Sequence, residues 1–367
     1  MMIAAGLLSI IAIGTGAALE PRKVFQWSNA EPVVGEVVAI TDQGIEIREE
    51  QQIIPVTIPW YDFRTVDGSG MSIGAYQQIA DDAWRAHARL ARGDFYGAEL
   101  IYTRLEEKYL WKTGPQSGDV SIGLVMCRLD RQDRAQAVKP YLSWLGSVDS
   151  LNPTDLDGVA GFDLEYKLLT DLPPVFGPKD RKELLSSIED TVRLTNRQQA
   201  LYGLFQLAQN TQIHRTAESN LAIETLKQLM RGRENRDPGL EFIEDLVVAQ
   251  AHEDIEKRNA ARHAIERRIR AHSGTWIELW GRLAVGVSLL GEEDTDSNER
   301  GVIELIHVVV RLDHVSQPLA AVASQLANEY FVRTNRSQWG DELMLEARTA
   351  WATGITEALS KEQAAHE

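Results

Sequence analysis

The sequence predicts a mainly α protein, in which a small β-barrel-like module at the N-terminus precedes an α-solenoid of helical hairpins. Between Lys23 and Gly68 apolar and polar residues alternate, as they do along strands. After Ser72 apolar residues recur every three or four positions, as they do on one face of a helix. One helical pattern also occurs twice at a fixed offset, which indicates an internal repeat.

The composition narrows the classes of function. The chain has 367 residues, with 54 Asp and Glu against 38 Lys and Arg, so its formal net charge is −16. Such a surface repels phosphate backbones, and we expect a protein or peptide partner and no nucleic acid. The single cysteine, Cys127, excludes an internal disulfide and a four-thiolate metal site. It lies in an apolar helical run, where we expect it to pack as a small hydrophobic residue rather than react as a thiol.

The N-terminus has the pattern of an export signal. Residues 1–19 carry no charged side chain, and the small residues that end this stretch provide a cleavage zone. We therefore interpret residues 1–18 as a signal peptide and expect export to the bacterial periplasm or cell envelope. Two alternatives are an uncleaved membrane anchor formed by residues 2–19 and an N-terminal core helix. Arg22 and Lys23, which follow the apolar run, favour the anchor, and membrane contact is expected only through such an uncleaved segment.

Residues 23–68 predict a small β module. The strand candidates are 24–27, 34–40, 45–47 and 53–58. Gly44 ends the turn 41–44, where glycine adopts positive φ at little cost, so the second and third strands should form a hairpin. Pro55 and Pro59 confine the fourth strand to an edge or a strand end.

The pieces Gly35-x-Val37 and Asp42-x-Gly44-Ile45-x-Ile47 resemble those of SH3-like barrels. This resemblance implies that aromatic residues near the last strand can line a peptide groove. The candidates for ligand contact are Trp27, Trp60, Tyr61 and Phe63. Packing in the core or between domains is the alternative for the same four side chains.

The repeat joins residues 90–102 to residues 129–141, which share five identities at an offset of 39 residues. In each copy a small alanine, Ala98 or Ala137, permits close helix approach, and a tyrosine follows one turn later. Such a spacing predicts two helical hairpins over 72–146.

The stretch Gly93-Asp94-Phe95-x-x-Ala98-x-x-x-Tyr102-x-x-Leu105 resembles the second helix of tetratricopeptide repeats. The first helix departs from that family, because Asp82, Arg85 and Arg89 stand at its large-residue positions. The resemblance implies a right-handed stack of hairpins whose concave face binds a peptide or a partner protein.

Four prolines and three glycines interrupt residues 147–180, which predicts a linker loop with at most a short helix over 162–169. Phe176 should pack across the solenoid, a binding role being the alternative. Residues 181–360 predict a second helical-repeat domain, with hairpins over 181–230, 240–270, 275–312 and 318–359. A frayed tail is expected over 361–367.

Three patterns carry possible chemistry. His252, Glu256 and His263 would share one face of a continuous helix, yet its apolar face leaves the histidines on a solvated flank and favours no zinc site. The acidic stretch 292–298 lacks the glycine and the terminal glutamate of a calcium loop, which favours a solvated connection. The basic run 257–272 points all around its helix and is expected to pair with acidic neighbouring helices.

Two hypotheses of function follow. The first is an exported non-catalytic scaffold that binds protein through a helical-repeat surface. It predicts a broad exposed apolar or aromatic groove on the concave side, including parts of the loop 146–180. The alternative is a cell-envelope enzyme that acts on polysaccharide or peptide with a pair of carboxylates. The candidate carboxylates are Asp94, Glu99, Glu241, Glu244 and Asp245. The sequence itself assigns no catalytic, cofactor-binding or metal-binding residue, and we expect no cofactor.

Overall fold

The computed structural model describes residues 21–50, 52–67, 73–148, 161–177, 188–189, 192–211, 216–230 and 237–347. The predicted signal peptide or anchor, much of the predicted linker and the predicted tail lie outside these residues. The chain divides into two compact units, which are described separately below. Unit 1 comprises residues 1–131 and 139–156, and unit 2 comprises residues 132–138 and 157–367.

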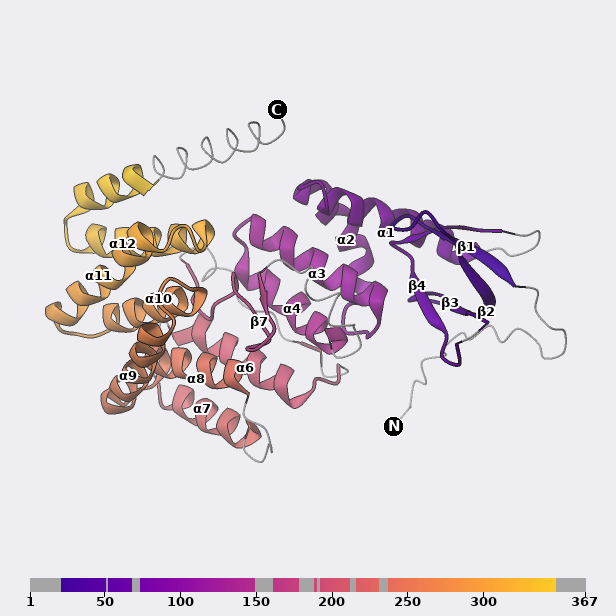
Figure 1. Cartoon of the computed structure of the whole chain (residues 1–367). Helices are drawn as coiled ribbons and strands as arrows, with labels where there is room; N and C mark the ends of the chain where they lie inside the picture. Colours follow the sequence, from indigo (N-terminus) through magenta and orange to yellow (C-terminus); the bar gives the residue numbers. More distant parts are fainter. Residues whose placement is uncertain are drawn as a thin grey trace. The chain divides into compact units, whose positions relative to one another are not determined.

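The β module of unit 1 is one antiparallel sheet that is not closed into a barrel (Figure 1). Its strands are β1 (Arg22–Gln26), β2 (Val33–Thr41), β3 (Gly44–Arg48), β4 (Val56–Pro59) and β5 (Phe63–Val66), in the spatial order β4-β3-β2-β1-β5. The predicted β2–β3 hairpin is confirmed, with Thr41 opposite Gly44. The prediction that the fourth strand lies at an edge is also confirmed.

Two details of the sheet differ from the sequence prediction. Ile53 and Ile54 precede β4 instead of belonging to it, and both side chains are exposed. The residues after Pro59 form a fifth strand, β5, because Asp62 ties the intervening turn to the end of β1. The backbone N–H and the hydroxyl of Ser28 both donate to this carboxylate, at 2.7 and 2.6 Å.

The helices of unit 1 pack against the sheet at the β2–β3 turn and, through α1, just beyond the end of β1. They are the 3-10 helix η1 (Gly74–Tyr76), α1 (Gln77–Leu90), α2 (Phe95–Tyr109), α3 (Pro115–Asp130) and α4 (Arg134–Val148), and the boundary between the units falls within α4. The side chain of Gln43 exchanges two hydrogen bonds with Ser117, and Tyr109 Oη donates to the carbonyl of Asp42 at 2.8 Å. Sheet and helices therefore share one apolar core.

The two predicted hairpins of the repeat are confirmed. Asp94 caps α2 by accepting a hydrogen bond from the backbone of Gly97, and Asp133 accepts from Gln136 in the second copy. Ala98 and Ala137 are both completely buried, as the close approach of paired helices requires.

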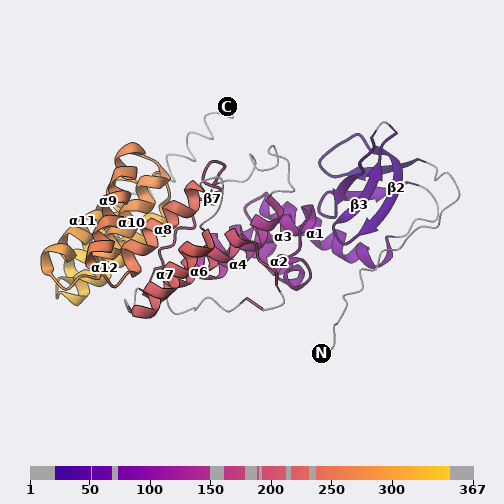
Figure 2. The same cartoon turned by 90° about the horizontal axis from the view of Figure 1, so that it is seen from below.

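Unit 2 is a row of helical hairpins placed side by side in chain order (Figure 2). Its helices are α6 (Asn196–Thr211), α7 (Ala217–Met230), α8 (Pro238–Ala251), α9 (Ile255–Ala271), α10 (Trp276–Leu290), α11 (Thr295–Arg311) and α12 (Gln317–Arg333), followed by a helical stretch over 337–347. The even-numbered helices contact one another in order and form one layer. Side chains of Asp237, Asp254, Thr275, Asp294 and Ser316 cap the N-termini of five helices.

A strap over 161–177 covers the layer of even-numbered helices. It contains a two-stranded hairpin of β6 (Phe162–Asp163) and β7 (Leu168–Leu169), so the short helix expected over 162–169 is wrong. The indole N–H of Trp276 donates to Asp163 at 3.0 Å, and that of Trp280 donates to the carbonyl of Thr170 at 2.7 Å. Phe176 is completely buried against Phe205, which confirms its predicted packing.

The close contact between the strap and α8 gives a stability test at Gly239. A Cβ atom at this position would lie 2.1 Å from the carbonyl oxygen of Tyr166. Gly239→Ala should therefore destabilise unit 2 by about 1–3 kcal/mol and increase hydrogen exchange in residues 161–177, although alanine alone favours a helix. Urea unfolding and hydrogen exchange measure the two effects. Leu221→Ala, at a side chain that is 71% exposed on α7, is the neutral control. Unchanged exchange in the strap would contradict the contact.

Candidate functional site

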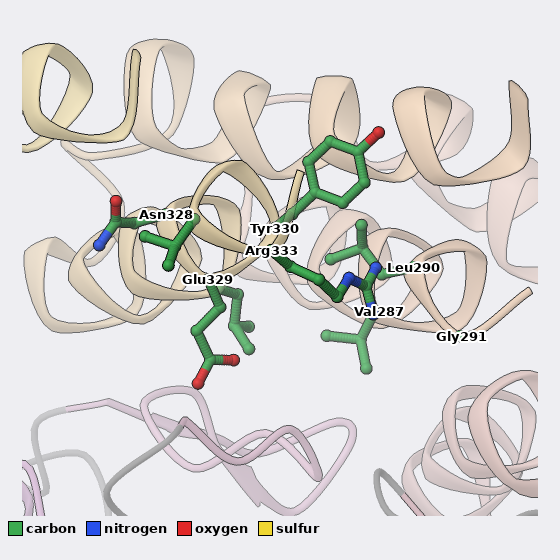
Figure 3. Close-up of a pocket in the computed structure, with 9 residues that line it drawn as sticks. Val287, Leu290, Gly291, Asn328, Glu329, Tyr330 and Arg333 are labelled. Atoms are coloured by element: carbon green, nitrogen blue, oxygen red, sulfur yellow. The ribbon is translucent and has the colours of Figure 1, made fainter. Parts of the chain in front are cut away.

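A groove of about 540 Å³ lies between the C-terminal parts of α10 and α12 (Figure 3). Val287, Leu290 and Leu326 give it apolar walls, and Glu329 and Arg333 add charge. The apolar side chain of Val332, which also lines the groove, is 55% exposed. The groove thus combines an apolar surface with side chains of both charges, as ligand-binding sites in general do.

Arg333 is exposed beside the groove. Its side chain extends beside Val287 and Leu290 (Figure 3). Its guanidinium donates to Asn298 Oδ1 at 3.0 Å and lies 5.6 Å from the centre of the Tyr330 ring. These two contacts restrict the side chain before a ligand binds, which lowers the entropic cost of binding.

Asn328 also lines the groove, but its side-chain oxygen points away from it (Figure 3). The Oδ1 atom is buried without a hydrogen-bond partner and lies against Gly340, in the helical stretch that follows α12. The groove therefore favours a ligand that brings an apolar group for its walls and a charged group for Glu329 or Arg333.

A buried ionic cluster joins α8, α9 and the end of α10, next to the groove. Glu292, in the loop that follows α10, accepts two hydrogen bonds from Arg258 at 3.0 and 2.7 Å and a further one from Arg262. The three side chains are only 7–8% exposed. Burial lowers the pKa of Arg262, and the hydrogen bond and charge of Glu292 oppose that shift. The same two arginines bind the end of α8 and Ser288, so the cluster joins three helices.

The cluster confirms one prediction and corrects another. The basic run of α9 does pair with acidic residues on its neighbours, through Glu292 and through Asp245, which lies 3.4 Å from Arg268. The acidic stretch 292–298 was predicted to be solvated throughout, which is wrong at Glu292 because two cations draw its carboxylate inward. The arginines that bind Glu292 lie at least 30 residues before it in the sequence, so no local pattern predicts these ion pairs.

Removal of the charge of Glu292 tests the cluster. Glu292→Gln keeps the shape of the side chain but leaves two buried guanidinium groups without their anion. We expect a loss of about 3–5 kcal/mol in the free energy of unfolding, measured with urea. Glu293→Gln, at the exposed neighbouring residue, is the matched control and should change stability by about 0.5 kcal/mol at most. Equal stability of the two variants would refute the structural role.

The histidine pattern of the basic run forms no metal site. The helix expected to carry His252 and His263 is broken, since α8 ends at Ala251 and Asp254 caps α9. His252 is therefore 2% exposed at the helix boundary instead of solvated, and burial lowers the pKa of its imidazole. No group of three His, Cys, Asp or Glu that could hold a metal ion occurs among the residues that the structure describes.

The four aromatic candidates of the β module separate into two kinds. Trp60 and Phe63 are buried, and Trp60 stacks on Tyr76. Trp27 is 47% exposed and stacks on Trp84 of α1, with the guanidinium of Arg64 5.1 Å from the centre of its ring. A second exposed surface therefore lies where β1 meets α1.

A polar network lies beside this aromatic pair. The ring of Tyr61 stacks on that of His87, whose Nδ1 is 2.6 Å from Asp119 Oδ1. Tyr102 Oη donates to the second oxygen of the same carboxylate at 3.2 Å. The hydrogen bond to Asp119 raises the pKa of His87, although burial acts in the opposite direction. Tyr102 and its repeat partner Tyr141 are buried, so neither belongs to a binding surface.

The raised pKa of His87 predicts a pH-dependent stability. A group with a folded-state pKa above its unfolded value stabilises the fold at low pH, and this contribution disappears as the pH rises through the folded pKa. Between about pH 6 and 8 the chain should lose roughly 0.5 kcal/mol, a small amount because solvent screens a half-exposed side chain. Urea unfolding across this range, with NMR titration of His87, measures it. Asp119→Asn should flatten the dependence, whereas His263→Gln should leave it unchanged.

The carboxylates proposed for an enzyme have structural partners. Asp94 caps α2, and Glu99 lies 2.8 Å from Arg131. Glu244 pairs with Lys227 at 3.4 Å, and burial raises its pKa despite that cation. Burial also raises the pKa of Asp245, against the effect of Arg268. The groove between α10 and α12 contains none of the five proposed residues among the side chains that line it.

Burial also determines the reactivity of the Cys127 thiol. Cys127 is completely buried, and desolvation raises its pKa to about 12. The predicted packing role is confirmed, because so weak an acid provides almost no thiolate at neutral pH.

The chain was compared with protein families, curated proteins and solved structures. No family model, no curated protein and no solved structure matches the chain. Within the described ranges no helix combines the length and the apolar composition that a membrane crossing requires.

Proposed function

We propose that the chain is an exported, non-catalytic scaffold of the tetratricopeptide-repeat type that binds a segment of a partner protein. The repeat of 90–102 in 129–141 and the stacked hairpins support this proposal at the level of architecture. The apolar, uncharged sequence of residues 1–18 supports export. Repeat stacks are suited to recognition because they present long surfaces of regular helices.

The groove between α10 and α12 is the observation that carries the proposal. It combines the apolar side chains of Val287 and Leu290 with the guanidinium of Arg333. A peptide supplies what these groups lack, namely an apolar side chain for the walls. A carboxylate on the same peptide can pair with Arg333.

The strap explains why recognition belongs at this groove and not on the layer of even-numbered helices. Leu168, Leu172, Val175 and Phe176 already bury their side chains there. The strap therefore occupies this layer as a bound peptide would. A partner that used the same layer would first have to displace these contacts, whereas the groove is open.

Arg333→Gln separates binding from folding. Because the side chain of Arg333 is exposed, this substitution should change the free energy of unfolding of the free chain by about 0.5 kcal/mol at most. It should weaken partner binding by about fivefold to a hundredfold, the equivalent of about 1–3 kcal/mol for a lost hydrogen bond to a charged group. A photoreactive amino acid at Val332 of the full chain, in its native cells, measures capture of the partner, and titration calorimetry with that partner measures affinity.

The matched control carries the photoreactive group at Leu221, which is 71% exposed on α7. We expect one protein to crosslink at position 332 and not at 221, and Arg333→Gln to reduce that crosslink. Equal labelling at both positions, or a crosslink that Arg333→Gln leaves unchanged, would show that the groove is not the binding site.

A further inference from the structure

One histidine is buried in the short connection between α8 and α9. His252 follows Ala251, the last residue of α8, and it is 2% exposed. Burial opposes the positive charge of an imidazolium, because a charged ring loses more hydration than a neutral one. The groups around the ring therefore determine whether it can take up a proton inside the fold.

The hydrogen bonds of the ring require its neutral form. The backbone N–H of Asp254 donates to His252 Nδ1 at 3.0 Å. A ring nitrogen that accepts carries no hydrogen, so the hydrogen of the neutral ring lies on Nε2. Nε2 is buried and finds no hydrogen-bond partner among the described residues. A proton on Nδ1 would face the Asp254 N–H, donor against donor, and would leave both N–H groups of the ring without an acceptor.

Charged groups from α7, α9 and the connection itself act on the ring. Lys257 on α9 and Lys227 on α7 oppose a positive charge there. Asp254 in the connection and Glu224 on α7 favour it. Burial is the largest effect, and together with the two lysines it lowers the pKa of His252 despite both carboxylates.

The connection that carries the ring is held from two sides. The guanidinium of Arg258 on α9 donates to the carbonyl oxygens of His252 and Glu253, at 2.8 and 2.6 Å. Asn220 on α7 accepts from the backbone N–H of Glu253 at 3.0 Å and donates to its carboxylate at 3.1 Å. A change at the ring therefore acts at the point where α7, α8 and α9 are joined.

We propose that His252 is an acid-sensitive latch: the neutral ring keeps the α8–α9 connection closed, and protonation opens it. Opening brings the imidazolium into water and detaches the connection from Asn220 and Arg258. Arg258 also binds Glu292 at 2.7 Å, so the open state leaves an arginine of the buried ionic cluster less restrained. The latch requires no partner at the groove and is independent of the proposed function.

The direction of the pH dependence follows from the two states of the latch. In the closed state the pKa of His252 lies below its ordinary value, whereas in the open state the hydrated ring titrates near about 6.5. The open state therefore binds more protons, and the closed state loses stability as the pH falls through this value. The sign is opposite to that expected for His87 in unit 1, whose contribution is lost as the pH rises.

Hydrogen exchange of the full chain between about pH 7.5 and 5.5 tests the latch. After correction for the intrinsic exchange rate, we expect the protection of amides 246–258 to fall about tenfold. This is the change that one proton taken up near pH 6.5 by the open state alone produces. Residues 317–333 of α12 contain no histidine and should keep their protection, so they serve as the internal control.

Two variants separate the latch from a general effect of acid. His252→Asn places an amide oxygen near the position of Nδ1 but cannot be protonated at neutral or mildly acidic pH, so it should abolish the fall in protection. His263→Gln, at a side chain that is 71% exposed on α9, is the matched control and should retain the fall. NMR titration of His252 in the unmodified chain needs no variant.

Three results would overturn the latch. They are unchanged protection of amides 246–258 in the unmodified chain, a fall in protection that His252→Asn leaves intact, and protonation of His252 near pH 6.5 while these amides stay protected. None of these results affects crosslinking at Val332, so failure here is distinct from failure of the scaffold proposal.

Discussion

The second half of the helical stack depends on the burial of one carboxylate, that of Glu292. Two arginines from α9 neutralise it in a site that water barely reaches. The free energy of desolvating three charged groups is recovered only if their geometry is complete, so α9 and the end of α10 must meet in one arrangement. Arg258 extends this constraint to the end of α8 through the carbonyls of His252 and Glu253.

The same constraint reaches the groove. The loop that holds Glu292 also accepts, through its carbonyls, two hydrogen bonds from the side chain of Asn298 on α11. Asn298 in turn accepts a hydrogen bond from Arg333 on α12. A buried ion pair therefore determines the orientation of a charged side chain at the candidate binding surface. Groups that are ordered before a ligand arrives give specificity at a lower entropic cost.

Local patterns predicted most of the fold and little of the site. Helical spacing, the Gly44 turn and the offset repeat depend on neighbouring residues, and all three are confirmed. Predictions from local sequence patterns were wrong where contacts between residues distant in the sequence determine the structure. Ile53 and Ile54 read as strand residues, yet a proline follows them and the sheet ends there. The burial of His252 and Glu292 depends on α9, and the walls of the groove come from two helices that no motif connects.

The strap determines how this stack can be used. A row of hairpins normally exposes the layer formed by alternate helices, but here Trp276 and Trp280 bind the backbone and side chains of residues 161–177 across that layer. The proline-rich segment suits this role, because its extended backbone fits a surface of helices and proline removes donors that would otherwise need partners. With that layer filled from within the chain, the groove at the C-terminal ends of α10 and α12 is the open surface that we propose for recognition.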